Sequence, residues 1–287
     1  MLTIAVSTRA LFNLGDGHAI FVESGQAAFD LYMKENELKP LRPGASFSVV
    51  KKLLALNDGR PAPEVQVVLL SSNSHSAGLR VMQSIQHHAL DISKAVFSGG
   101  SERYRYAKAF GVHLFLSTNE EEARRASMAG VPCAILSATE PNTVSDTELR
   151  VAFDGDAVIF SGEAEHVYQT QGLAAFNLSE QRNAGRPLSK GPLEPLLVAL
   201  SKLRNEGAPI RTALVTARGV AAHERALRTL ESWDVKMDEA IFADGFNKGL
   251  LLEAFGAELF FDDTLRHINN ARPFVLSGHV PPACSHN

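Results

Sequence analysis

Part of this chain repeats itself, and the repeat restricts the possible fold more than any other feature of the sequence. The stretch Leu69–Thr118 aligns without a gap with Leu214–Asp263, an offset of 145 positions, and Arg80 and Arg225 are among the identical residues. At an offset of 147, the segment IAVSTRAL near the start also aligns with VAFDGDAV. We therefore expect two copies of one structural unit.

Short apolar strands alternate with helical segments in the repeated unit. The first half predicts strands at 3–6, 65–70, 95–97 and 112–116, a polar turn at 13–18, and helices at 24–36, 45–56, 77–88 and 103–110. Such alternation is typical of parallel sheets, because a helix carries the chain back to the start of the next strand. The predicted class is α/β, a parallel sheet flanked by helices.

Composition restricts the class of partner. The chain has 287 residues, of which 45% are hydrophobic and 21% charged, and these values suit one large globular domain or two ordinary ones. A net charge of -4 argues against binding a nucleic-acid polymer and favours small-molecule partners. The two cysteines, Cys133 and Cys284, are too few for a zinc site or a disulfide framework.

No stretch of the sequence reaches the length of a membrane span, and the first residues, MLTIAVSTRALF, lack the pattern of a secretory signal. We therefore expect a cytoplasmic protein that does not bind membranes. The sequence leaves open whether it forms a homo-oligomer.

Polar side chains stand where the apolar strands of the second half end. In VAFDGDAVIF, the apolar run Val151–Phe153 leads directly into Asp154 and Asp156. A turn at Gly155 can bring both carboxylates above the strand end, where open α/β sheets bind ligands. One carboxylate could attack a phosphorus atom while the other handles the leaving-group proton. The alternative is an ordinary Asp-Gly turn, with solvated acids or a bound metal ion.

Three further segments follow in the same order along the chain. The strand Arg211–Thr216 ends in a hydroxyl, Lys248 precedes a helical run, and the strand from Glu258 ends in Asp262 and Asp263. This ordered set resembles the haloacid dehalogenase superfamily of phosphotransferases. Longer segments, including FSVVKKLLALN, VVLLSSNS, FDGDAVIFS, VTARGVAAHERALRTLESW and KGLLLEAFGAELFFDD, narrow the resemblance to the cytosolic 5'-nucleotidase I family.

The resemblance implies a catalytic role for four residues. Asp154 would be the nucleophile that forms an aspartyl-phosphate, and Asp156 would be the general acid and then the base for water. Thr216 would hold a phosphoryl oxygen, and Lys248 would neutralise developing charge. The implied reaction is hydrolysis of nucleoside 5'-monophosphates to nucleoside and phosphate, with AMP favoured.

The resemblance also implies a Mg²⁺ cofactor. Asp154, Asp262 and the backbone carbonyl of Asp156 would bind the ion, and Asp263 would orient water or a neighbouring ligand. Oxygen ligands around a phosphate are the usual setting of Mg²⁺. Without a cation and Lys248, four carboxylates near one phosphate would repel it.

The first half lacks the carboxylates of the second half. The aligned positions of the first half carry hydroxyls and arginines, namely Ser7, Arg9, Ser71, Arg103, Ser117 and Thr118. It therefore cannot hold a hard cation in the same way. We hypothesise that this degenerate unit contacts the nucleoside or an effector nucleotide through Arg9 and Arg103. Alternatively, its strand ends carry soluble residues without a function. Unchanged substrate and effector dependence after alanine substitution of both arginines would exclude the hypothesis.

Asn73 and Arg218 are two further candidates for substrate binding. The sequence predicts a degenerate unit at 1–145 and a catalytic domain at 146–287, joined by a turn-rich linker at Ala138–Asp146. An insert at about 161–210, with helices at 163–170 and 194–206, suggests a small helical cap over the strand ends. Arg186 and Lys190 in this insert would face the phosphate or remain as exposed charges.

Two other functions remain open. The first is a phosphatase of the same superfamily that acts on another small phosphomonoester, which a substrate panel would reveal. The second is a non-enzymatic nucleotide sensor built on the duplicated half. The full catalytic set in the second half argues against the sensor.

Overall fold

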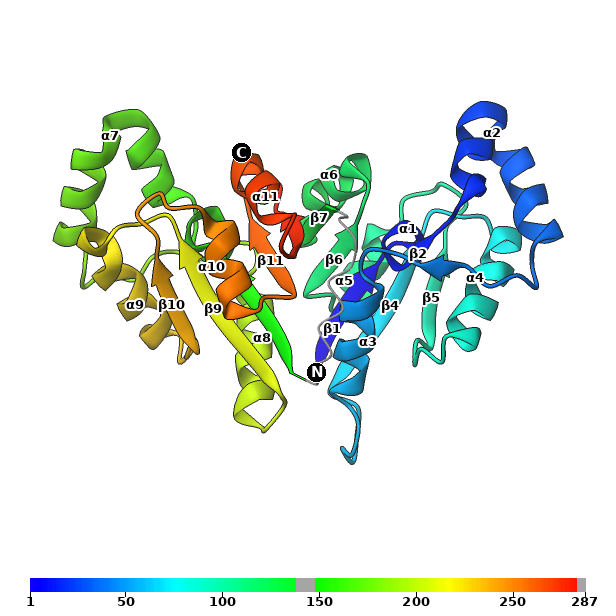
Figure 1. Ribbon diagram of the computed structural model, residues 1–287, viewed down its shortest axis with the longest axis horizontal. Coiled ribbons are helices and arrows are strands. Elements are labelled where there is room, and N and C mark those ends of the chain that lie inside the picture. Colours follow the sequence, from blue (N-terminus) through cyan, green and yellow to red (C-terminus); the bar gives the residue numbers. More distant parts are fainter. Residues whose placement is uncertain (138–147, 283–287) are drawn as a thin grey trace. The chain divides into compact units, whose positions relative to one another are not determined.

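The computed structural model describes residues 1–137 and 148–282, and the chain divides into two compact units, Met1–Leu136 and Ser137–Asn287. The division therefore falls nine residues before the predicted boundary at 145. The predicted linker Ala138–Asp146 lies outside the described residues. Each unit is an α/β structure and is described by itself (Figure 1).

The first unit is a parallel five-stranded sheet with the order β7-β6-β1-β4-β5. Its strands are β1 (Leu2–Val6), β4 (Val65–Ser71), β5 (Lys94–Phe97), β6 (Leu114–Ser117) and β7 (Cys133–Ser137). Its helices are α1 (Thr8–Leu11), α2 (Asp16–Glu35), α3 (Phe47–Ala55), α4 (His75–His87), α5 (Tyr104–Ala109) and α6 (Glu120–Met128). The two-residue strands β2 (Phe12–Asn13) and β3 (Arg42–Pro43) form a small antiparallel pair.

The second unit has the same strand order, β12-β11-β8-β9-β10, and its strands are also parallel. Its strands are β8 (Leu149–Phe153), β9 (Ile210–Thr216), β10 (Glu239–Phe242), β11 (Leu259–Asp262) and β12 (Leu276–His279). Its helices are α7 (Glu163–Arg182), α8 (Glu194–Asn205), α9 (His223–Ser232), α10 (Lys248–Phe255) and α11 (Leu265–Ala271).

The two units agree in strand register as well as in strand order. Leu2–Val6 pairs with Val65–Leu69 in the first unit, and Leu149–Phe153 pairs with Ile210–Leu214 in the second. These pairings are related by the offsets of 147 and 145 that the sequence alignment uses. Since a slip of one residue would move every side chain to the other face, equal register places aligned residues at equivalent positions.

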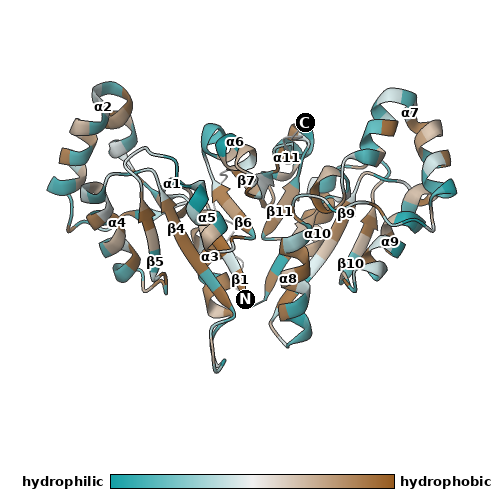
Figure 2. Ribbon diagram, turned by 180° about the vertical axis from the view of Figure 1, so that it is seen from behind, coloured by the Kyte–Doolittle hydropathy of each residue, from teal (hydrophilic) through white to brown (hydrophobic). Residues whose placement is uncertain are grey.

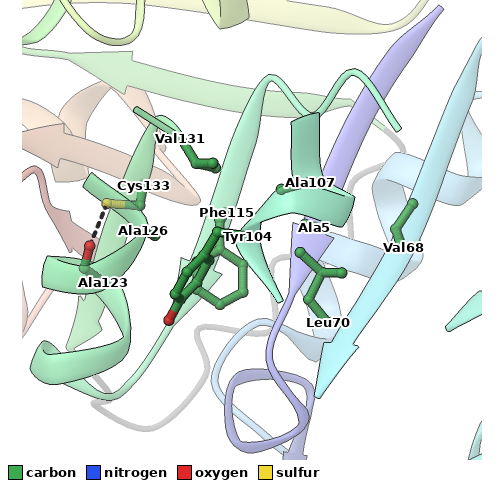
Figure 3. Packing of buried hydrophobic residues seen from close by; sticks show 10 residues of the cluster. All are labelled: Ala5, Val68, Leu70, Tyr104, Ala107, Phe115, Ala123, Ala126, Val131 and Cys133. Carbon is green, nitrogen blue, oxygen red and sulfur yellow. Dashed lines mark hydrogen bonds between the residues drawn. The ribbon is translucent and has the colours of Figure 1, made fainter. Parts of the chain in front are cut away.

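Equivalent cores pack against the two sheets. In the first unit, Tyr104 and Ala107 of α5 and Ala123 and Ala126 of α6 cover Phe115 and its neighbours (Figure 3). In the second, α10 and α11 cover the equivalent strand residues, including Ala213, Val215 and Phe260. The strands are mostly hydrophobic, whereas the helices carry hydrophilic faces (Figure 2). This pattern is that of parallel strands buried beneath helices.

The predicted turn at 13–18 is wrong, because α2 already begins at Asp16. Gly25 interrupts α2 with φ 79°, a conformation that favours glycine, and divides it into two helical segments. The first segment is largely exposed and has no apolar stripe, so hydrophobic periodicity could not reveal it. In the second unit, α7 has the same length and the same interruption, at Gly172 with φ 82°.

The cap helix predicted at 194–206 corresponds to α8, which packs against the sheet. Helix α8 contacts β9, and its side chains Leu196, Leu197, Leu200 and Leu203 are buried. Helix α7 contacts the turn at 155–159, as α8 also does, and it contacts the turn at 220–222 and helix α9 as well. Helix α7 therefore contacts both turns that follow β8 and β9, where the sequence predicts the cap, and α2 is its equivalent in the first unit. The other predicted helices and strands of the first unit differ from the observed ones by up to two residues at their ends.

Candidate functional site

Three carboxylates and one ammonium group meet at the carboxyl ends of β8 and β11. Ligand oxygens of Asp154, Asp262 and Asp263 all lie within 4.8 Å of one another. Lys248 Nζ donates to Asp154 Oδ1 at 2.8 Å and to Asp262 Oδ2 at 2.6 Å. Four of the residues predicted for the site therefore form one cluster.

The fold fixes this cluster through the backbone. Asp154 directly follows β8, and its N–H donates to the carbonyl of Phe261 on β11 at 2.8 Å. Lys248 is the first residue of α10, where the Asn247 side chain caps the helix by accepting from the Gly249 N–H. The Lys248 side chain is only 1% exposed, so its charge is committed to the two carboxylates.

Asp262 has two further partners that the sequence reasoning missed. Its Oδ1 accepts from the Thr264 N–H at 2.8 Å, and His267 Nδ1 lies 3.0 Å from its Oδ2. His267 lies on α11, five residues after Asp262. A histidine on the helix after an acidic strand end is the signal that would have identified it.

Burial and charge give the cluster unusual proton affinities. Burial, opposed by Lys248 and reinforced by Asp262, raises the pKa of Asp154 to about 8. Burial and then the Asp262 charge raise the pKa of Asp263 to about 6. For Asp262 itself, burial is outweighed by His267 and Lys248, which lower its pKa. Burial also opposes the charge of Lys248, but Asp154 and Asp262 raise the pKa of this lysine.

The donor set suits a hard divalent cation. Three carboxylates and one ammonium group leave a formal charge of -2 in a small volume. Oxygen ligands and excess negative charge are the features that Mg²⁺ sites share. Asp154, Asp262 and Asp263 would hold the ion. The Asp156 carboxylate is not part of this group of three, and the ion contact predicted for its backbone carbonyl stays a prediction.

Cation affinity should depend on pH. An ion that binds Asp154 and Asp263 must displace the protons that their raised pKa values favour. Between pH 6 and 8 Asp154 still carries a proton, whereas Asp263 has lost most of its own by pH 7, so we expect the apparent Kd for Mg²⁺ to fall by about tenfold per pH unit, and more steeply near pH 6. Titration calorimetry in two buffers of different ionisation enthalpy measures both the Kd and the proton count. A Kd that is independent of pH would contradict the expectation.

Asp156 and Thr216 lie beside the cluster with different partners. The Asp156 carboxylate accepts two hydrogen bonds from Arg218, from Nε at 2.8 Å and Nη2 at 2.7 Å. The Thr216 hydroxyl is buried at the end of β9 and accepts from the Arg218 N–H at 3.2 Å. Arg218, which was predicted to bind substrate, therefore donates two hydrogen bonds to Asp156, a predicted catalytic residue.

The equivalent strand ends of the first unit form a different arrangement. Arg103, which aligns with Lys248, is buried, and its Nη2 lies 2.7 Å from the Glu122 carboxylate. Glu122 also accepts from the Ser117 hydroxyl at 2.7 Å. An internal ion pair therefore stands where the second unit has its carboxylate cluster, and the anion contact predicted for Arg103 stays a prediction.

The remaining candidates are more exposed. Arg9 Nη2 lies 3.4 Å from His18 Nε2, and the half-buried Asn73 has no hydrogen-bond partner for its side-chain nitrogen among the described residues. Lys190 pairs with Glu194 at 2.8 Å, and the Arg186 carbonyl accepts from Arg225 at 2.9 Å. Within the described residues of the second unit, neither Arg186 nor Lys190 makes a hydrogen bond or an ion pair with the Asp154 cluster.

Comparisons with known proteins identify the family of this chain. A family model described as 5'-nucleotidase matches residues 1–287. Human cytosolic 5'-nucleotidase 1B is 36% identical over an alignment of 287 positions, which covers 94% of this chain and 47% of that protein. The chain thus spans about half the length of this relative. No solved structure matches the chain significantly. Within residues 1–137 and 148–282, no helix is long and apolar enough to cross a bilayer. From its full-length match, the chain belongs to the 5'-nucleotidase family.

Proposed function

We propose that this protein is a Mg²⁺-dependent 5'-nucleotidase that hydrolyses nucleoside 5'-monophosphates, AMP foremost, to nucleoside and phosphate. The observation that carries the proposal is the buried cluster of Asp154, Asp262 and Asp263 around Lys248, in a chain of the 5'-nucleotidase family. The preference for AMP rests on the family resemblance. A cytosolic location rests on the name of the human relative.

In the first half-reaction, a carboxylate oxygen of Asp154 attacks the phosphorus. An O–P bond forms to Asp154 while the bond from phosphorus to the 5'-oxygen breaks, and Asp156 gives its proton to that oxygen. Lys248 neutralises charge on the transferred group, and the Thr216 hydroxyl holds a phosphoryl oxygen. A bound Mg²⁺ would supply positive charge to the phosphoryl oxygens and keep the Asp154 carboxylate ionised.

In the second half-reaction, water attacks the aspartyl-phosphate. Asp156, now ionised, takes a proton from the water as the new O–P bond forms and the bond to Asp154 breaks. Inorganic phosphate leaves, and Asp154 returns to its starting form. The bidentate contact with Arg218 suits the ionised form of Asp156, which this step needs.

A phosphate-release panel with the purified protein tests the proposal. We expect release from nucleoside 5'-monophosphates, AMP fastest, slower release from simple sugar phosphates, and none after EDTA treatment until Mg²⁺ is restored. Faster release from a sugar phosphate would favour the second candidate, a phosphatase for another small phosphomonoester. No release from any substrate would favour a nucleotide sensor.

A further inference from the structure

A buried ion network connects Asp156 to helix α7. Arg218 binds both oxygens of the Asp156 carboxylate and donates through Nη1 to Glu180 of α7. Glu180 accepts at its other oxygen from Arg225 Nη1 at 2.8 Å. The side chains of Arg218 and Glu180 are 2% and 1% exposed, so solvent cannot replace either partner.

The surroundings of Arg218 hold its guanidinium in one place. Its central carbon lies 5.9 Å from the ring centroid of Phe160 and 5.3 Å from that of Phe176. Nη1 also donates to the Ala222 carbonyl at 3.3 Å. Because Phe176 and Glu180 both come from α7, the docking of this helix completes the environment of Arg218.

The duplication provides an internal comparison. It separates contacts that occur in both units from contacts that occur only in the unit with the carboxylate cluster. Arg80 of the first unit donates through Nε to the Lys39 carbonyl at 2.9 Å, and Arg225 donates in the same way to the Arg186 carbonyl at 2.9 Å. This contact occurs in both units and therefore serves the common fold.

The rest of the network occurs only in the unit that carries the carboxylate cluster. At the offsets of 147 and 145, Glu180 aligns with Met33, Arg218 with Asn73 and Asp156 with Arg9. Met33 is buried, and the sulfur of Met33 lies 3.6 Å from Arg80 Nη1. Since the first unit folds with methionine at this position, the fold does not require the Glu180 charge.

A buried arginine with two carboxylate partners keeps a counter-charge when one of them leaves. Asp156 has to turn at least one oxygen from Arg218 to the leaving oxygen of the substrate. Glu180 then remains as the partner that holds Arg218 in position. Without Glu180, Asp156 would be the only acidic partner of Arg218 and would be held away from the substrate.

We propose that Glu180 and Arg218 are positioning residues for Asp156, so that proton donation to the leaving group depends on the docked cap helix α7. The inference rests on the proposed function, because it assigns Asp156 the role of acid. It predicts a defect only where the leaving group needs a proton. Two substrates with the same nucleoside isolate this step, namely AMP and its 5'-S-phosphorothiolate analogue, whose sulfur leaves as a thiolate.

The test measures first-turnover release of adenosine or 5'-thioadenosine under Mg²⁺. For Glu180→Gln, we expect release from AMP to slow by about 10- to 100-fold, the usual effect of losing an orienting partner, with less than about a threefold change for the analogue. The KM for AMP should stay near that of the wild type. If Glu180→Gln does not fold, Glu180→Met combined with Arg218→Asn installs the uncharged pair of the first unit and should show the same selective loss.

The matched control is Glu163→Gln on the same helix. Glu163 lies at the exposed end of the network, where it pairs with Arg225 at 2.7 Å, and its loss should change neither rate by more than about twofold. Equal slowing of both substrates by Glu180→Gln, or no slowing of either, would overturn the positioning role. A wild-type protein that releases nothing from either substrate would instead overturn the proposed function.

Discussion

Asp154→Asn should abolish turnover, with kcat lower by about 10⁴-fold or more for every phosphomonoester, because an amide cannot form the aspartyl-phosphate. The substitution should leave the fold intact. Burial raises the pKa of Asp154 to about 8, so ionising the folded carboxyl costs stability that grows as the pH rises from about 4 and is complete above pH 8, and a neutral amide removes this cost. Steady-state phosphate release and thermal unfolding at pH 8 measure the two effects.

The exposed Asp91→Asn is the control, and it should retain the wild-type rate. Denaturation with acid should trap radioactive phosphate from labelled AMP on the wild-type protein but not on Asp154→Asn. Trapped label on the variant, or undiminished phosphate release, would rule out Asp154 as the nucleophile.

Lys248→Met should reduce both activity and stability. The ammonium group lies between the Asp154 and Asp262 carboxylates, and its loss leaves two buried acids without their cation. We expect a loss of about 3–5 kcal/mol in the free energy of unfolding without divalent ions. Loss of charge neutralisation should lower kcat by about 10²- to 10³-fold. Urea unfolding at pH 7.5 and phosphate release measure the two losses.

Saturating Mg²⁺ should restore part of the stability of Lys248→Met, because a cation in the cluster replaces some of the missing positive charge. The matched control is Lys202→Met, since the Lys202 side chain is 72% exposed and pairs only weakly with Glu206 at 3.9 Å. Its free energy of unfolding should change by less than about 0.5 kcal/mol. A Lys248→Met protein as stable as this control would contradict the assigned geometry.

Part of helix α2 and the partner of Arg103 are two features that the sequence patterns did not reveal. The first segment of α2 has little apolar periodicity and was missed, although the corresponding segment of α7, at an offset of 147, was predicted as a helix. Arg103 was predicted as an anion contact because it aligns with Lys248. Its partner Glu122 lies on another helix, and no local pattern joins the two.

The sequence by itself determined the class of fold and the duplication, because apolar periodicity and the alignment of the two halves can be read from the chain without its tertiary contacts. It also indicated that Asp154, Thr216, Lys248 and Asp262 stand at strand ends or at a helix start. Only the tertiary structure decided the partners of each charge, including Arg218 with Asp156 and His267 with Asp262. The reason is physical, since a buried charge is satisfied by whichever opposite charge the packing brings within hydrogen-bond distance, at any separation in sequence.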